Sequence, residues 1–213
     1  MNTIKAWHFA TSNKKLCYGD SRPVRRNVRY FARPKNKELE LCHHGMHGSL
    51  NILDALKYAP GNVITWCEFG GQIIYGKDKL VADWRKPLWV YNATLILQEF
   101  SRWCALQVAH LWKCPDVVKQ YLETGDEALR EKYRKAAAID YSVNAASTAD
   151  AARSSAYSAV ANYSNIDAMA RAANYSRIDS DYADSRANNR GIMNERQEQR
   201  LIEMLTNVGW ENS

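Results

Sequence analysis

At 213 residues the chain can form one large domain or two small ones, and 46% hydrophobic with 24% charged residues argues against wholesale disorder. The first fifteen residues lack an apolar core, so we expect no secretory signal, and we find no apolar run long enough to span a membrane. Five cysteines, odd in number and without a C-x-x-C pair, predict free thiols in a reducing cytoplasm.

The positive charge is concentrated near the N-terminus. Residues 1–37 carry ten Lys or Arg against one acid, Asp20, whereas the remaining residues carry 19 basic and 22 acidic groups. Arginines and aromatic residues alternate in its densest part, a pattern typical of polyanion contacts. A solvated basic strand pair and loop is the alternative. The candidate binding residues of this basic segment are Arg22, Arg25, Arg26, Arg29, Tyr30 and Arg33.

Residues 1–91 are predicted to form a basic α+β domain with a single helix among short strands. Ser49 follows a glycine-punctuated loop and is predicted to cap a helix over 50–58, which Pro60-Gly61 ends. Gly70-Gly71 is predicted to be a turn or bulge after a core strand, whose partner would be 72–75. The predicted strands are 4–10, 16–18, 28–31, 63–69, 72–75, 76–83 and 88–91.

Residues 92–135 are predicted to be a helical extension. Large apolar residues recur at helical spacing over 94–114. Pro115 suits the start of the next helix, which runs to about Glu123 before the cap sequence 124–126.

Residues 136–213 are predicted to be an alanine-rich helical region that ends in an amphipathic helix over 194–205. Alanines repeat in it at alternating spacings of four and three residues, which lets helix backbones approach closely. We expect this seam to drive homo-oligomerisation through the C-terminal helices; a β-solenoid is the minority alternative. The seam begins with Ala145, Ala149, Ala152, Ala156 and Ala159.

Three segments in the first half resemble an uncharacterised family of bacteriophage and prophage proteins. They are LCHHGMHGS (41–49), NILDALKYAPG (51–61) and WCEFGGQIIYGKDKLVADWR (66–85). That family has a Leu-Cys-x-x-Gly-x-His-x-Ser signature, a later Asp-Lys pair and an alanine-rich C-terminal region. The resemblance implies a phage origin but brings no established activity or catalytic residues.

A weaker resemblance, at the level of the fold, links Gly45 to Tyr58 with ADP-ribosyltransferase-like domains. It implies that His47 or Ser49 binds the ribose of NAD and that Tyr58 stacks on nicotinamide. A Glu-x-Glu or Gln-x-Glu motif on a late strand is absent from the sequence, which argues against transfer activity. The catalytic candidates on this interpretation are His8, His47, Tyr58 and Glu68.

Other polar residues have two interpretations each. Cys42 and the histidines 43, 44 and 47 suggest zinc, but no second ligand pair follows at finger spacing, so we expect no metal and a His47 that fixes its loop through hydrogen bonds. Lys79 and Arg85, with Asp78, form either a structural ion-pair set or the rim of a pocket. With Ser49 they are counted among the candidate binding residues.

Three functions therefore remain open. The leading one is a phage accessory protein in the host cytoplasm that binds and modulates a host or anti-phage defence protein, without a cofactor. An ADP-ribosyltransferase that uses NAD is one alternative. A nucleic-acid-binding or virion-associated structural protein is the other.

Overall fold

A computed structural model describes residues 2–17, 20–34, 37–137 and 187–210, together with 154–156, 158–159, 172–173 and 176. The fold is mixed α/β with an antiparallel sheet. The chain divides into two compact units, Met1–Thr94 with Ile202–Ser213, and Leu95–Leu201. The last residues thus belong to the first unit, whereas the sequence groups them with the alanine-rich region. In the described part of the chain, no helix is long and apolar enough to cross a membrane.

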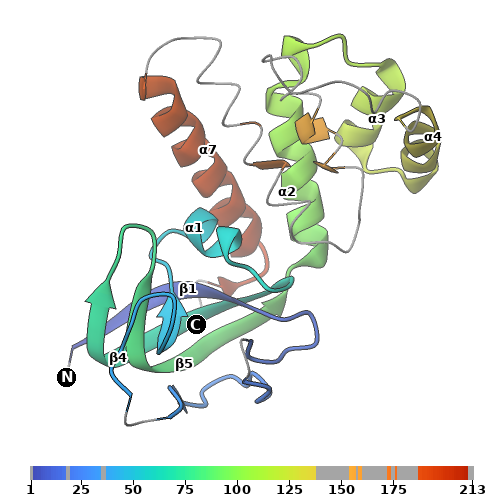
Figure 1. The fold of residues 1–213 in the computed structure, drawn as a ribbon. Helices are drawn as coiled ribbons and strands as arrows, with labels where there is room; N and C mark the ends of the chain where they lie inside the picture. Colours follow the sequence, from blue (N-terminus) through green and yellow to red (C-terminus); the bar gives the residue numbers. More distant parts are fainter. Residues whose placement is uncertain are drawn as a thin grey trace. The chain divides into compact units, whose positions relative to one another are not determined.

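The first unit is built on a five-stranded antiparallel sheet in the order β1 (Thr3–Ala10), β4 (Val63–Tyr75), β5 (Leu80–Asn92) and β2 (Tyr30–Phe31). The short strand β3 (Met46–Gly48) also pairs with β5 (Figure 1). Ser49 and Trp7 then exchange two backbone hydrogen bonds, of 2.8 and 2.9 Å. Because β3 thereby connects β5 back to β1, the sheet curls round one core.

The strands β4 and β5 form one long hairpin, so the prediction that 72–75 pairs with the preceding strand is wrong. A bulge lies between Gly70 and Ile73, where Gly71 has a φ of +83° and the Asp83 carboxylate accepts the Gln72 N–H at 2.6 Å. A glycine can adopt this φ at little cost. The bulge therefore continues the strand instead of ending it, and the two segments expected at 76–83 and 88–91 are joined in β5.

The two faces of the sheet have different coverings. The inner face carries Ala6, Cys67 and Phe69, which pack with Leu16 and Val24 from the loop before β2. Figure 1 shows this loop on one side of the sheet and α1 (Ile52–Lys57) on the other. On the outer face the three tryptophans Trp7, Trp66 and Trp210 cluster, with ring centroids 4.6 to 5.4 Å apart. The C-terminal residues are thus bound to the first unit by aromatic contact.

The helix α1 begins two residues later than predicted and has a different cap. The side-chain oxygen of Asn51 accepts the N–H groups of Leu53 at 2.8 Å and Asp54 at 3.4 Å. Ser49 is held by the bridge to Trp7 instead, so its prediction as the N-cap is wrong. Asn51 is an equally good capping residue, and the strand pairing decides between the two.

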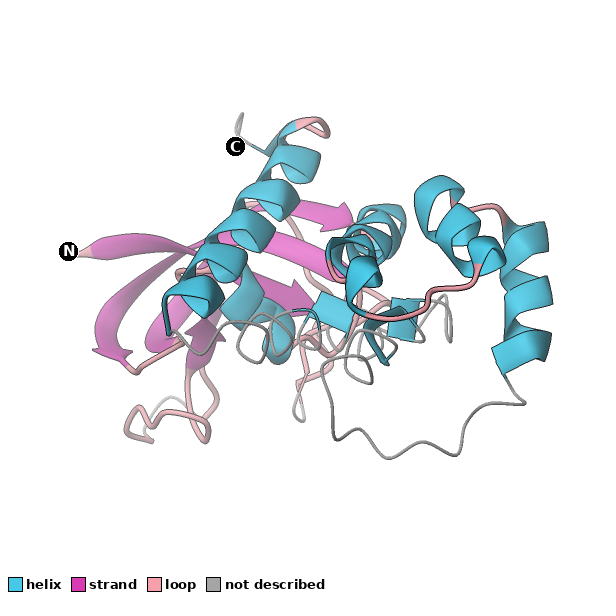
Figure 2. Ribbon diagram, turned by 90° about the horizontal axis from the view of Figure 1, so that it is seen from above, coloured by secondary structure: helices cyan, strands magenta, loops and turns pink. Residues whose placement is uncertain are grey.

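The second unit is helical where it is described (Figure 2). The helix α2 spans Thr94–Gln107, shorter than predicted, because a 3-10 turn at Ala109–Leu111 follows it. Pro115 occupies the position before the first residue of α3 (Asp116–Thr124), and Gly125 ends the helix with a φ of +71°, as predicted. Two further helices are α4 (Glu127–Ala137) and α7 (Ala187–Thr206), the latter continuing across the boundary between the units.

The described part of the alanine seam packs within the chain. Ala156 is fully buried with Ala105, Val118 and Tyr121, and Ala159 packs against the same cluster. A buried hydrogen bond of 2.8 Å joins the Ser155 hydroxyl to the Ala172 carbonyl in the same unit. Ala145, Ala149 and Ala152 lie outside the described residues. The alanines therefore do allow close approach, and for Ala156 the partner is α2 and α3 of its own chain.

Candidate nucleic-acid interface

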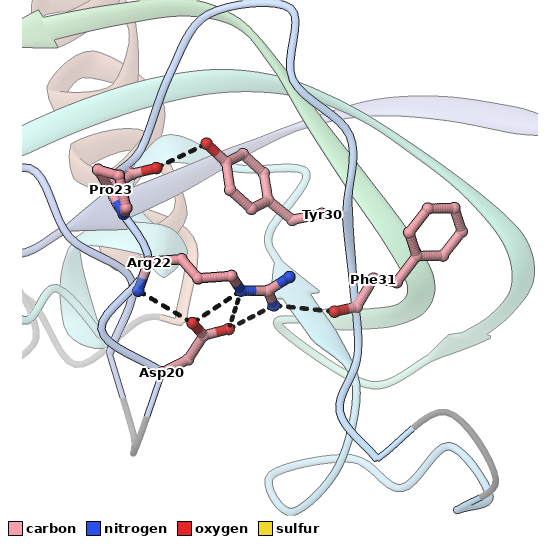
Figure 3. A network of polar contacts seen from close by, with 5 residues as sticks. All are labelled: Asp20, Arg22, Pro23, Tyr30 and Phe31. Carbon is pink, nitrogen blue, oxygen red and sulfur yellow. Dashed lines mark hydrogen bonds and ion pairs between the residues drawn. The ribbon is translucent and has the colours of Figure 1, made fainter.

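The basic segment before and within β2 is held by a network of internal hydrogen bonds (Figure 3). The buried Tyr30 donates its hydroxyl proton to the Pro23 carbonyl at 2.7 Å and accepts the Arg25 N–H at 2.8 Å. Arg22 forms an ion pair with Asp20 and donates to the Phe31 carbonyl at 2.9 Å. These contacts tie the loop to the edge strand.

Two of the six residues predicted for the interface, Arg22 and Tyr30, thereby bind other parts of the protein itself. The Arg22 guanidinium lowers the pKa of Asp20 by hydrogen bonding to its carboxylate, so this pair is neutral as a unit. Tyr30 is only 4% exposed. Arg22 and Tyr30 therefore support the segment from within, and a direct contact of either with a ligand stays a prediction.

The other four arginines are exposed, and none forms an ion pair with a described residue. The Arg29 guanidinium stacks over the Trp84 ring at 4.0 Å, which holds it against the edge of the sheet. Phe31 is 37% exposed beside them, and its ring points away from the Arg22 guanidinium in Figure 3. The group consists of Arg25, Arg26, Arg29 and Arg33, and we call it the arginine edge.

The signature loop is a separate feature, organised by its own histidine. Cys42 has a φ of +70°, and its backbone N–H donates to the Nε2 of His47 at 3.0 Å. Gly45 has a φ of +132°, and a Cβ there would lie 2.1 Å from Val81. The prediction that His47 fixes its loop by hydrogen bonding is confirmed. Burial, together with the charges of Arg85 and Lys79, lowers the pKa of His47.

The later signature residues meet this loop at the β4–β5 turn. The Lys79 ammonium lies 3.2 Å from the Cys42 sulfur and 3.8 Å from the centre of the Tyr58 ring. Tyr58 donates to the Asp78 carboxylate at 2.7 Å. Asp78, Lys79 and Arg85 thus do not form the ion-pair set that was one of two interpretations. Sequence reasoning also missed Cys42 as the partner of Lys79, since only the fold brings them together.

His8 and Arg85 lie on the inner face. The His8 Nδ1 is 3.3 Å from the Thr65 hydroxyl, which itself donates to the His8 carbonyl at 2.8 Å. Arg85 is 4% exposed and donates to the His47 carbonyl at 2.8 Å. Burial, and then the charge of Arg85, holds the pKa of His8 well below its usual value, so His8 is neutral at pH 7.

The four catalytic candidates do not share one cleft. His47 alternates with Met46 and Gly48, which face the inner core, so its ring points away from the face that carries His8. Glu68 alternates with Cys67 and forms an ion pair with Lys86 on the outer face. Tyr58 joins His47 only through Cys42 and Lys79. Among the described residues, no three His, Cys, Asp or Glu side chains are grouped as a metal site.

A shallow hollow of about 570 Å³ lies along the loop 11–21, lined by Thr11, Lys15, Leu16 and Asp20 among others. It contains none of the catalytic candidates. No protein-family model, curated protein or solved structure matches this chain.

Proposed function

We propose that the first unit binds nucleic acid through its phosphate backbone, without sequence preference, at the arginine edge. The observation that carries the proposal is that these four guanidiniums are exposed and form no ion pair with a described acid, although Arg29 and Arg33 act electrostatically on Glu68 and Asp20. Internal hydrogen bonds hold the segment that carries them. Surface arginines close together repel one another, and phosphates remove that cost while releasing counterions.

The setting also favours a nucleic acid over a generic anion. Phe31 offers an exposed ring beside the guanidiniums, and bases stack on aromatic side chains whatever their sequence. The Arg29 guanidinium already lies over an aromatic ring, that of Trp84. Arginine is suited to phosphate because its planar fork can donate two hydrogen bonds to one group.

This proposal takes up the nucleic-acid-binding alternative from the sequence, and the leading expectation can be combined with it. A phage accessory protein that modulates a host or defence component would, on this account, engage one that carries nucleic acid. ADP-ribosyl transfer is the alternative proposal, with NAD as its cofactor. The arrangement of His8, His47 and Glu68 described above does not favour it.

Direct titration tests the proposal. Fluorescent DNA and RNA strands of unrelated sequence should bind the wild type equally, and Arg25→Gln/Arg26→Gln should weaken all of them alike. Lys14→Gln/Lys15→Gln is the matched control, because both lysines are exposed and removing them changes the net charge equally. Undetectable binding by the wild type, or equal weakening by the two double variants, rejects the arginine edge as the interface.

A further inference from the structure

Arg85 is a buried cation that forms no ion pair with a described residue, and its guanidinium lies 5.9 Å from the centre of the Phe69 ring. It is 96% buried, and its Nε makes no hydrogen bond. Its single hydrogen-bonded contact in the described structure is the neutral carbonyl of His47. A buried charge without a partner costs several kcal/mol, so proteins rarely retain one without a use.

The groups that could neutralise Arg85 do not do so. Burial raises the pKa of the nearby Cys67 thiol to about 11, so it stays protonated at neutral pH. Asp20 is the nearby acid that acts on Arg85, but its carboxylate already forms the ion pair with Arg22. The Tyr30 hydroxyl already donates its proton to the Pro23 carbonyl. His47, which also acts on His8, carries no negative charge either.

We propose that the inner face of the first unit binds a phosphoryl group of a small ligand between Arg85 and His8. The guanidinium supplies N–H donors, and His8 on the same face is only partly buried. Neither residue belongs to the arginine edge, so this site is independent of nucleic-acid binding. A guanidinium with spare donors in a dry setting binds an oxyanion more strongly than one in water.

A melting-temperature assay on the full chain tests the site with inorganic phosphate, ADP-ribose and NAD as probes. Sodium acetate and sodium chloride at matched ionic strength are the controls. Saturating phosphate or ADP-ribose should raise the Tm of the wild type by roughly 5 °C, whereas acetate and chloride should not. No shift with any phosphate-bearing probe, or the same shift with acetate, overturns the proposal.

Arg85→Met separates binding from a structural role. If Arg85 is kept for a ligand, removing its buried charge should leave the Tm without ligand unchanged or higher and abolish the phosphate shift. Arg85→Lys keeps the charge without the fork and should retain part of the shift. Lys57→Met removes an exposed charge from the same unit and should keep all of it. A phosphate shift that survives in Arg85→Met shows that the anion binds elsewhere.

Discussion

Tyr30 positions Arg25: the buried phenol accepts the backbone N–H of the arginine at 2.8 Å while its own proton goes to Pro23. An internal side chain thus fixes the backbone from which exposed guanidiniums extend. The arginine edge is therefore a supported surface, and its geometry depends on a residue that a ligand never touches.

Tyr30→Phe should accordingly weaken both the fold and the interface. It leaves the Arg25 N–H and the Pro23 carbonyl without their partner, which should cost about 1–2 kcal/mol in the free energy of unfolding. Nucleic-acid affinity should also fall although no charge is lost. Denaturant unfolding and titration measure the two effects. Tyr91→Phe is the control, because the Tyr91 hydroxyl makes no hydrogen bond to a described residue; equal losses in both variants would remove the role assigned to Tyr30.

The protein should lose stability as the pH falls below about 6.5, the ordinary pKa of histidine. The folded state lowers the pKa values of His8 and His47, so the unfolded chain takes up protons first and is favoured in acid. His8→Gln/His47→Gln should flatten the stability profile between pH 7 and 5. Asp20 and Glu68, whose pKa values are also lowered, lose their contributions at lower pH. A wild-type profile that is flat from pH 7 to 5 would contradict this account.

Asn51→Ala should destabilise the first unit by about 1 kcal/mol, because it removes the acceptor for two N–H groups at the start of α1. Ser49→Ala should cost less, since Ser49 acts through its backbone bonds to Trp7. Urea unfolding of the two variants compares them. A larger loss for Ser49→Ala would restore Ser49 as the residue that matters at this helix.

Ala156→Leu should destabilise the second unit by about 1–3 kcal/mol, because a larger side chain has no room among Val118, Tyr121 and Leu122. Ala128→Leu, on an exposed position of α4, is the control and should be nearly neutral. Thermal unfolding measures the cost, and sedimentation shows whether association changes. If Ala156→Leu instead dissociated an oligomer and left the stability of the single chain unchanged, Ala156 would have to lie in a contact between chains.

The sequence predicts the elements whose signals are local. Pro115 and Gly125 mark the ends of α3 because each acts on its own backbone, and the turn residues that follow Ala10 mark the end of β1. Where local signals allow two structures, backbone pairing between distant segments decides between them. Ser49 and Asn51 are both good capping residues, but Ser49 pairs with Trp7 through its backbone, which leaves Asn51 as the cap. Gly70-Gly71 fits a turn by its residues, but the hydrogen bond from the Gln72 N–H to Asp83 stabilises a bulge there.

The candidate site follows the same division. Exposed charge in the basic segment is visible from composition, but which arginines are free depends on contacts with Asp20 and Phe31. The sequence does not show that Arg85 lacks an ion-pair partner. That depends on the Cys67 thiol staying protonated and on the Asp20 carboxylate already binding Arg22.

The salt dependence of nucleic-acid affinity tests the central claim most directly. The logarithm of the association constant for a single strand should fall linearly with the logarithm of salt concentration, with a slope of about −0.7 for each phosphate neutralised. Replacing Arg25, Arg26, Arg29 and Arg33 by glutamine should therefore make the slope shallower by about 3. An unchanged slope in that variant would show that the phosphates are held elsewhere and would contradict the account.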